Sequence, residues 1–157
     1  MTNHQQTYES PLGPITITAT RRGISSLYFK PPEQADCPNE HTSMCAQQLD
    51  AYFQGQQTSF DVPLDVNGTA FQKQVWQALQ DIPYGQVASY RDIAIAIGNP
   101  KAMRAVGAAN GKNPVSIVVP CHRVIGADGS LTGYAGGLSR KQHLLQLEAK
   151  AMFNHHH

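Results

Sequence analysis

Cysteine, long apolar runs and charge are all scarce in this chain of 157 residues. The three cysteines are widely spaced and odd in number, so they do not make a disulfide framework, and we expect reduced thiols. No apolar run approaches the ~20 residues of a membrane-spanning helix, and the chain does not open with the basic and then apolar segments of a signal peptide. These absences predict a cytoplasmic protein without a membrane partner.

The net charge is only +1, but the two halves of the chain differ. Residues 1–66 carry seven acids and three bases, a net charge of −4, whereas residues 67–157 carry four acids and nine bases, a net charge of +5. A basic half is typical of a nucleic-acid binder. A basic face that is merely solvated gives the same balance, so the charge alone leaves both interpretations open.

The N-terminal part has the pattern of a small α+β domain. Three β-prone stretches separated by proline- and glycine-containing turns predict a three-stranded antiparallel sheet: residues 8–10, 15–19 and 24–29. A helix is expected over residues 42–53, ending before Gly55. Residues 61–68 contain proline, asparagine and glycine and predict a linker.

These patterns divide the chain into three parts. We expect a scaffold domain with its linker over residues 1–66 and a second domain over residues 67–153. Residues 154–157 end in three histidines and are interpreted as the remnant of a purification tag.

Cys37, His41 and Cys45 recur every four residues, a spacing that invites a zinc interpretation. A structural zinc site normally takes four ligands, and no fourth is evident nearby. We therefore expect no metal and no cofactor, and the N-terminal part is interpreted as scaffold.

Four helices are predicted in the C-terminal part. Capping pairs mark the start of three of them: Thr69 with Gln72, Ser89 with Asp92, and Ser139 with Gln142. The remaining helix is expected over residues 101–110, with Asn99 as its N-cap and Pro100 in its first position. It follows the helix at Ser89 after about three residues, so the two predict a helix-turn-helix.

The predicted helix over residues 101–110 is almost without bulk, because half of its residues are alanine or glycine. Such residues often allow close packing on a neighbouring helix. Alternatively, small side chains let the helix backbone approach a DNA groove while Lys101 and Arg104 contact phosphates or the base stack. The composition fits either interpretation.

The apolar run over residues 115–119 ends at Pro120, and Cys121, His122 and Arg123 follow it directly. Proline cannot donate to a sheet ladder, so the pattern predicts a buried strand that delivers the thiol to a rim. A cysteine after an apolar run is most often a small buried hydrophobe. The adjacent histidine and arginine favour the thiolate instead, which is the nucleophilic form.

Two further features follow the cysteine. A glycine-rich loop around Tyr134 either brings backbone amides close to a ligand or is a mobile surface loop. In the last helix, Glu148 falls within a stripe of apolar residues. A carboxylate there is expected to be paired, with a histidine as its natural partner, unless it is exposed at a fraying helix end.

Pro120-Cys121-His122-Arg123-Val124, preceded by Asn113-Pro114 and Ile117, resembles the acceptor motif of the O6-alkylguanine-DNA alkyltransferases of bacterial type, the methylated-DNA–protein-cysteine methyltransferases. The similarity runs from about Gly68 to Glu148, and more weakly through the N-terminal part. It implies a ribonuclease-H-like N-terminal domain and a winged-helix-like C-terminal domain. It also implies that a flipped O6-alkylguanine, or O4-alkylthymine, gives its alkyl group irreversibly to Cys121.

The resemblance also implies roles for individual residues. The catalytic set is Cys121, His122, Glu148, Asn113 and Tyr90, with a water between the histidine and the thiol. The substrate-binding set is Val124, Tyr134, Ala135 and Arg123. The DNA-binding set is Arg104, Ala102, Met103, Lys101, Gly107 and Lys112. The expected partner is double-stranded DNA, bound by a monomer.

Two rival functions were weighed. A non-catalytic alkyltransferase-like protein binds lesions and recruits other repair, but such proteins lack the acceptor cysteine, which is present here. A cysteine hydrolase needs a direct contact between cysteine and histidine, which adjacent residues make poorly, and it leaves the helix-turn-helix unexplained.

Overall fold

The structure, a computed structural model, describes residues 3–155 of the chain and has the predicted α+β class. It divides into two compact units, and the division falls between Asn67 and Gly68. The last two histidines of the predicted tag lie outside the described residues. No helix of the described chain is long and apolar enough to cross a membrane.

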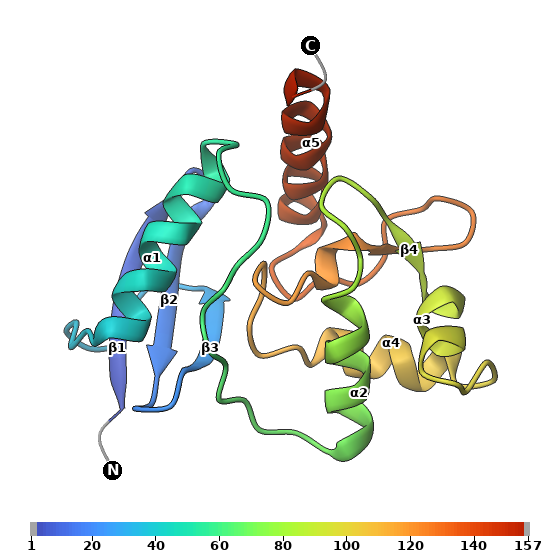
Figure 1. The fold of residues 1–157 in the computed structure, drawn as a ribbon, viewed down its shortest axis with the longest axis horizontal. Helices are drawn as coiled ribbons and strands as arrows, with labels where there is room; N and C mark the ends of the chain where they lie inside the picture. Colours follow the sequence, from blue (N-terminus) through green and yellow to red (C-terminus); the bar gives the residue numbers. More distant parts are fainter. Residues whose placement is uncertain (1–2, 156–157) are drawn as a thin grey trace. The chain divides into compact units, whose positions relative to one another are not determined.

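The N-terminal unit is a three-stranded antiparallel sheet with a helix on one face (Figure 1). The strands are β1 (His4–Ser10), β2 (Gly13–Ala19) and β3 (Ile24–Phe29), in that order, and the helix is α1 (Glu40–Phe53). The predicted strands and helix are confirmed. Strand β1 begins four residues before the predicted Tyr8, and it is paired with β2 along its whole length.

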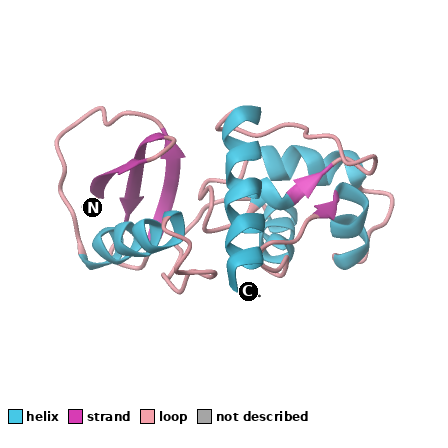
Figure 2. Ribbon diagram, turned by 90° about the horizontal axis from the view of Figure 1, so that it is seen from above, coloured by secondary structure: helices cyan, strands magenta, loops and turns pink. Residues whose placement is uncertain are grey.

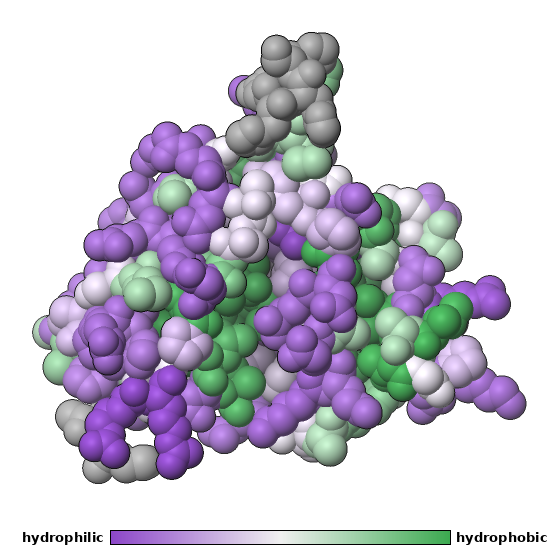
Figure 3. All heavy atoms as spheres, in the orientation of Figure 1, coloured by the Kyte–Doolittle hydropathy of each residue, from purple (hydrophilic) through white to green (hydrophobic). Residues whose placement is uncertain are grey.

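The core of this unit lies between the sheet and α1. Ile15, Ile17 and Leu27 are completely buried in the sheet, and Leu49 and Tyr52 are completely buried on the helix. The other side of the helix is polar, and hydrophilic residues cover much of it on the face drawn in Figure 3. The unit thus has the amphipathic layering of a domain with its own core.

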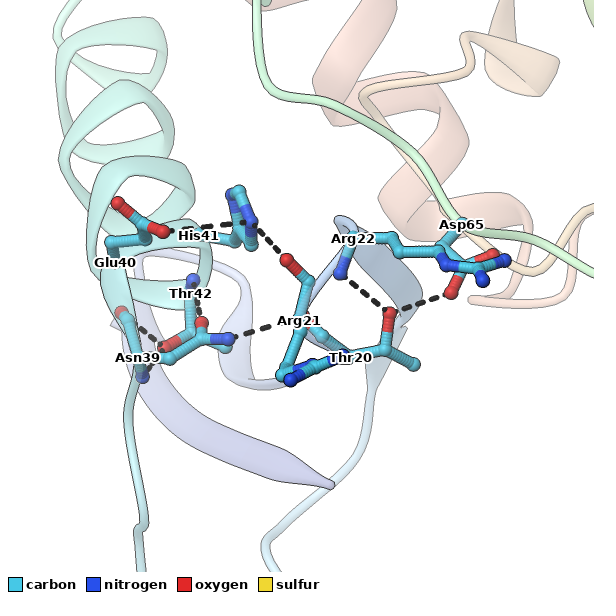
Figure 4. Close-up of polar contacts among 8 residues, drawn as sticks. All are labelled: Thr20, Arg21, Arg22, Asn39, Glu40, His41, Thr42 and Asp65. Atoms are coloured by element: carbon cyan, nitrogen blue, oxygen red, sulfur yellow. Dashed lines mark hydrogen bonds and ion pairs between the residues drawn. The ribbon is translucent and has the colours of Figure 1, made fainter. Parts of the chain in front are cut away.

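The turn between β2 and β3 holds the start of α1 (Figure 4). Asn39 caps the helix in a reciprocal exchange with Thr42, and its amide donates to the Thr20 carbonyl at 3.1 Å. A ring nitrogen of His41 hydrogen-bonds the Arg21 carbonyl at 3.0 Å. Helix α1 begins earlier than predicted because Asn39 supplies the cap.

The zinc interpretation of the N-terminal cysteines is not supported. Cys37 is exposed, Cys45 is completely buried, and the Nε2 atom of His41 is engaged with a carbonyl. In the described part of the chain, no three histidine, cysteine or carboxylate side chains are gathered in a way that could hold a metal ion.

The C-terminal unit is mostly helical. Its helices are α2 (Ala70–Leu79), α3 (Tyr90–Ala96), α4 (Met103–Gly111) and α5 (Leu138–His155). Helices α2, α3 and α4 pack against one another, and α3 and α4 form the predicted helix-turn-helix with a connection of six residues, 97–102, instead of about three. Two short parallel strands, β4 (Ala88–Ser89) and β5 (Val124–Ile125), lie side by side next to α3 (Figure 2). The capping pairs at Thr69 and Ser89 are both present.

Two predicted helix starts are wrong. Asn99 does not cap α4: the helix begins at Met103, with Ala102 as its N-cap, and Asn99 lies in the connection, where its N–H bonds back to the Ala94 carbonyl of α3. Ser139 does not cap α5, because the helix begins at Leu138, before it. The N-cap of α4 thus lies three residues after the predicted one, whereas the predicted cap of α5 lies inside the helix.

Candidate active site

The cysteine is carried by a turn, not by the predicted strand. Residues 115–119 fold back on themselves: the Val119 N–H donates to the Val115 carbonyl at 3.0 Å, and Ile117 has a φ of 71°. Positive φ is rare for a β-branched residue, so the surroundings must hold this backbone in place. Asn113 does so, because its amide donates to the Val119 carbonyl at 2.8 Å and its side-chain oxygen accepts from the Val115 N–H at 3.0 Å.

Cys121 opens a single 3-10 turn, η1 (Cys121–Arg123), and is buried instead of lying at an open rim. Burial raises the pKa of the thiol to about 11, while the Asn113 side chain and the charge of Lys141 act in the opposite direction. The resting thiol is therefore protonated near neutral pH. The sequence had indicated a thiolate, because it shows the basic neighbours but not the loss of water.

Glu148 lies on α5 and receives both residues that follow the cysteine. Its Oε2 atom is 2.6 Å from His122 Nε2 and 3.1 Å from an Arg123 terminal nitrogen, and its Oε1 atom accepts from Arg123 Nε at 2.8 Å. All three side chains are buried. The predicted pairing of Glu148 with a histidine is confirmed, but the sequence did not indicate the arginine.

The carboxylate also accepts from the Gly85 N–H at 3.2 Å, and Arg123 donates to the Ile82 carbonyl at 2.7 Å. Both residues belong to the segment between α2 and β4. Glu148 and Arg123 therefore connect three separated segments of the unit. Arg123, which was expected to bind substrate, has its guanidinium engaged in the interior.

The charge of this cluster rests on Glu148 and Arg123. The hydrogen bonds and charges of His122 and Arg123 hold the pKa of Glu148 at about 2, despite its burial. Burial lowers the pKa of His122 below its ordinary value although the hydrogen bond and charge of Glu148 act to raise it, and the charges of Arg123 and Lys141 act in the same direction as burial. The imidazole is thus neutral at rest, donates from Nε2 to the carboxylate, and leaves Nδ1 as a base. Nδ1 is buried, with no partner among the described residues.

Lys141 on α5 was not singled out from the sequence. It is completely buried, and its Nζ atom donates to the Val124 carbonyl at 2.5 Å and to the Thr132 carbonyl at 2.6 Å. It therefore connects Val124 in β5 to Thr132, which lies two residues before Tyr134 in the glycine-rich loop. The stripe that contains Leu144 and Glu148 reaches Lys141 one turn earlier, and that periodicity was the signal available in the sequence.

The remaining predicted pocket residues are Tyr90, Tyr134 and Ala135. Tyr90 is the first residue of α3, and its hydroxyl is 2.7 Å from the Thr132 hydroxyl. Tyr134 is half-buried in the loop, and burial together with Cys121 raises the pKa of its hydroxyl well above the ordinary value. Ala135 is exposed beside it.

Helix α4 presents a flat exposed face. Val106, Ala109 and Asn110 are buried, and the Ala109 carbonyl accepts from the Trp76 indole at 2.8 Å. Other residues of the predicted DNA-binding set are exposed: Lys101, Met103, Arg104 and Lys112. Ala102 and Gly107 are half-buried, and a side chain at Gly107 would meet the Tyr90 ring at 3.8 Å. The small residues therefore fit both interpretations: some are buried against neighbouring elements, and others leave an exposed surface without bulky side chains that a DNA groove could approach.

A helix-turn-helix unit that carries a buried cysteine beside a histidine–carboxylate pair defines a DNA-binding protein that reacts through its own thiol. Comparison with known proteins agrees with this class. Residues 70–150 match the family model described as 6-O-methylguanine DNA methyltransferase, DNA binding domain, and residues 3–66 match its ribonuclease-like domain. The chain belongs to the 6-O-methylguanine DNA methyltransferase family.

Individual relatives are similar over nearly their whole length. A methylated-DNA–protein-cysteine methyltransferase of Methanosarcina acetivorans is 51% identical over 148 residues, which cover 90% of this chain and 95% of the relative. One of Mycobacterium tuberculosis is 50% identical over 151 residues, 92% of each chain. The crystal structure of Mycobacterium tuberculosis OGT in complex with DNA matches with a TM-score of 0.87 at 48% identity, covering 94% of both chains.

Proposed function

We propose that this protein repairs DNA by moving the alkyl group of an O6-alkylguanine onto Cys121. The observation that carries the proposal is the Cys121-His122 turn, in which a nucleophile is followed by a histidine locked 2.6 Å from the buried Glu148 carboxylate. The family and the DNA complex of a relative support the substrate and the partner. We also infer that the protein acts in the cytoplasm as a monomer.

The transfer is a displacement at a saturated carbon. His122 Nδ1 accepts the thiol proton through a water, and Glu148 stabilises the imidazolium that forms. The sulfur then forms a bond to the alkyl carbon as the carbon–O6 bond breaks, and the electron pair of that bond moves into the guanine. Tyr90 donates its proton to guanine N3, which leaves a neutral base. A thioether does not hydrolyse under mild conditions, so each molecule reacts once.

The pocket residues take matching roles. The carbonyls of Cys121 and Val124 accept from the guanine amino group; the Val124 carbonyl keeps a free lone pair because Lys141 uses only one. The Ala135 amide faces O6, and Tyr134 forms the loop side of the pocket. Asn113 braces the acceptor turn. We reassign Arg123 from substrate binding to holding Glu148 ionised, because its donors are engaged with Glu148 and Ile82.

Helix α4 is the proposed DNA-reading element. Arg104 is exposed on the helix among small side chains, and the exposed bases Lys101 and Lys112 flank its two ends, which suits contact with phosphates and a close approach to a groove. Arg104 would occupy the space left by the rotated base. Gly107 lies beside Tyr90 and is assigned to the pocket wall instead of to direct DNA contact.

The test is a reaction with duplex DNA that contains one O6-methylguanine. We expect the intact mass of the protein to rise by one methyl group at one equivalent, with the adduct mapped to Cys121. Cys121→Ser is expected to bind the lesion without gaining mass. Binding by the wild type without any mass gain would favour the lesion-binding alternative, and an adduct on Cys37 or Cys45 would contradict the assignment of the acceptor.

A further inference from the structure

Thr132 forms a contact that the mechanism above does not use. Its hydroxyl oxygen is 2.7 Å from the hydroxyl oxygen of Tyr90, across 42 positions of the chain, and either group can be the donor. Both residues are half-buried. The contact joins the end of the glycine-rich loop to the first residue of α3, which is the residue proposed to act on guanine N3.

The backbone around Thr132 is fixed independently of its side chain. The buried Lys141 donates to the Thr132 carbonyl at 2.6 Å and to the Val124 carbonyl at 2.5 Å. A Cβ built at Gly107 on α4 would lie 3.8 Å from the Tyr90 ring, but the glycine has no side chain to bond the phenol. Thr132 is therefore held at the phenol by main-chain contacts, so its hydroxyl can change roles without moving the loop.

We propose that Thr132 is a positioning residue for alkyl transfer, which supplies a hydrogen bond to the phenol oxygen of Tyr90 while the phenol donates to guanine N3. The proposal rests on the proposed function. When the carbon–O6 bond breaks, the proton of Tyr90 moves to N3 and negative charge moves to the phenol oxygen. A hydroxyl has one donor and two acceptor sites, so Thr132 can turn its proton toward that oxygen as the charge develops.

Three variants separate the hydroxyl from the shape of the residue. Thr132→Val keeps the branched shape and the carbonyl that Lys141 holds, but it removes the hydroxyl. Thr132→Ser keeps the hydroxyl. Ser130→Ala is the matched control, because it removes a hydroxyl from the same loop whose hydrogen bond goes to Asp128 within that loop and not to Tyr90.

The measurement is the single-turnover rate of methyl transfer from duplex DNA containing O6-methylguanine. Thr132→Val is expected to slow transfer about tenfold, the scale of one hydrogen bond to a developing charge. Thr132→Ser is expected to stay within about twofold of the wild type, as is Ser130→Ala. Absence of transfer by the wild type would refute the proposed function itself and would be visible before any variant is compared.

A double-mutant cycle with Tyr90→Phe decides between the hydrogen bond and simple packing. If Thr132 acts through the phenol, Thr132→Val causes no further loss when Tyr90 is already phenylalanine. The same prediction holds for wild-type Tyr90 with a 3-deaza analogue of O6-methylguanine, which has no N3 to receive the proton. An equal loss with and without the phenol, or with and without N3, would overturn the proposal.

Discussion

Arg123 and Glu148 form a buried, two-pronged ion pair, with Arg123 Nε 2.8 Å from Oε1 and a terminal nitrogen 3.1 Å from Oε2 of the same carboxylate. Arg123 belongs to the same 3-10 turn as the proposed acceptor Cys121. The carboxylate also receives His122, so the histidine is oriented by a charge that a second residue already balances. The state of the proposed base therefore depends also on the arginine that shares its carboxylate.

Glu148→Gln is expected to cost about 3 kcal/mol of stability, because it leaves Arg123 buried without a counter-charge. The pKa of Glu148 is held at about 2, below its ordinary 4.5, so its contribution is complete above pH ~4.5 and is lost as the pH falls toward 2. Denaturant unfolding at several pH values measures this. Glu40→Gln, at a side chain that is 86% exposed, is the control. Equal stability of the two variants would contradict the role of the pair.

Thiol reagents should distinguish the three cysteines. Burial raises the pKa of Cys121 to about 11 and that of Cys45 to about 12, whereas Cys37 is exposed. Iodoacetamide at neutral pH is therefore expected to modify Cys37 first, while alkylated DNA modifies Cys121 alone. Because more thiolate forms as the pH rises, labelling of Cys121 should accelerate toward alkaline pH. Fast labelling of Cys121 at pH 7 would show that another group activates the resting thiol.

Arg104→Ala is expected to slow repair of duplex DNA at least tenfold and to leave the reaction with free O6-benzylguanine nearly unchanged. Arg104 is exposed on α4, so its removal affects extrusion of the base and not the pocket. Single-turnover rates on the two substrates give the comparison. Arg91→Ala, an exposed arginine on α3, is the control for loss of charge. Equal losses on both substrates would contradict the assigned role.

Lys141→Met should slow methyl transfer and loosen the glycine-rich loop without leaving a cavity in the core. The substitution keeps length and bulk but removes the ammonium that bonds the Val124 and Thr132 carbonyls, and whose charge lowers the pKa of Cys121. We expect slower methyl transfer, a thiol that titrates at higher pH, and faster proteolysis within the loop. Lys150→Met, at an exposed position of the same helix, is the control. A loop that stays protected would mean that Lys141 does not hold it.

Gly85→Ala should destabilise the protein more than Gly98→Ala. Both glycines have positive φ, 80° and 78°, so either alanine is expected to cost about 1 kcal/mol of backbone strain. At Gly85 the new Cβ would also lie 2.5 Å from Met152 Cγ, whereas nothing lies within 4 Å at Gly98. Unfolding midpoints measure the difference. In the Met152→Ala background, Gly85→Ala should destabilise the protein no more than Gly98→Ala does, because the clash with Met152 is gone. If Gly85→Ala is still more destabilising there, the cause is the disturbed hydrogen bond from the Gly85 N–H to Glu148.

The sequence predicted the elements whose cause is local. Ser89 and Asp92 bond each other's backbone within one turn, so their spacing alone announces the start of α3. Asn99 and Ser139 carry the same kind of signal, yet neither caps a helix. In the first case the Asn99 N–H bonds the Ala94 carbonyl of α3 and the Asn99 carbonyl accepts from the Ala102 N–H, so a further turn of chain lies between the two helices.

The predicted strand over residues 115–119 is wrong for a similar reason. An apolar run of five residues fits a buried strand or a buried turn equally well, and only the side-chain bonds of Asn113 decide in favour of the turn. The protonated state of Cys121 and the neutral state of His122 depend on burial, which cannot be predicted from the residues that adjoin them in the sequence. Arg123 and Lys141 have partners 25 and 17 positions away along the chain, so their roles also needed the fold.

The short ladder between β4 and β5 has a consequence for how the site tolerates change. Ala88 faces Val124 and Ser89 faces Ile125, and Tyr90 and η1 adjoin these pairs directly. The alignment of the phenol with the thiol is thus set by main-chain register, which most side-chain replacements leave intact. Insertion or deletion of one residue on either strand shifts that register by a whole step. Insertions and deletions in β4 and β5 are therefore expected to be more damaging than substitutions there.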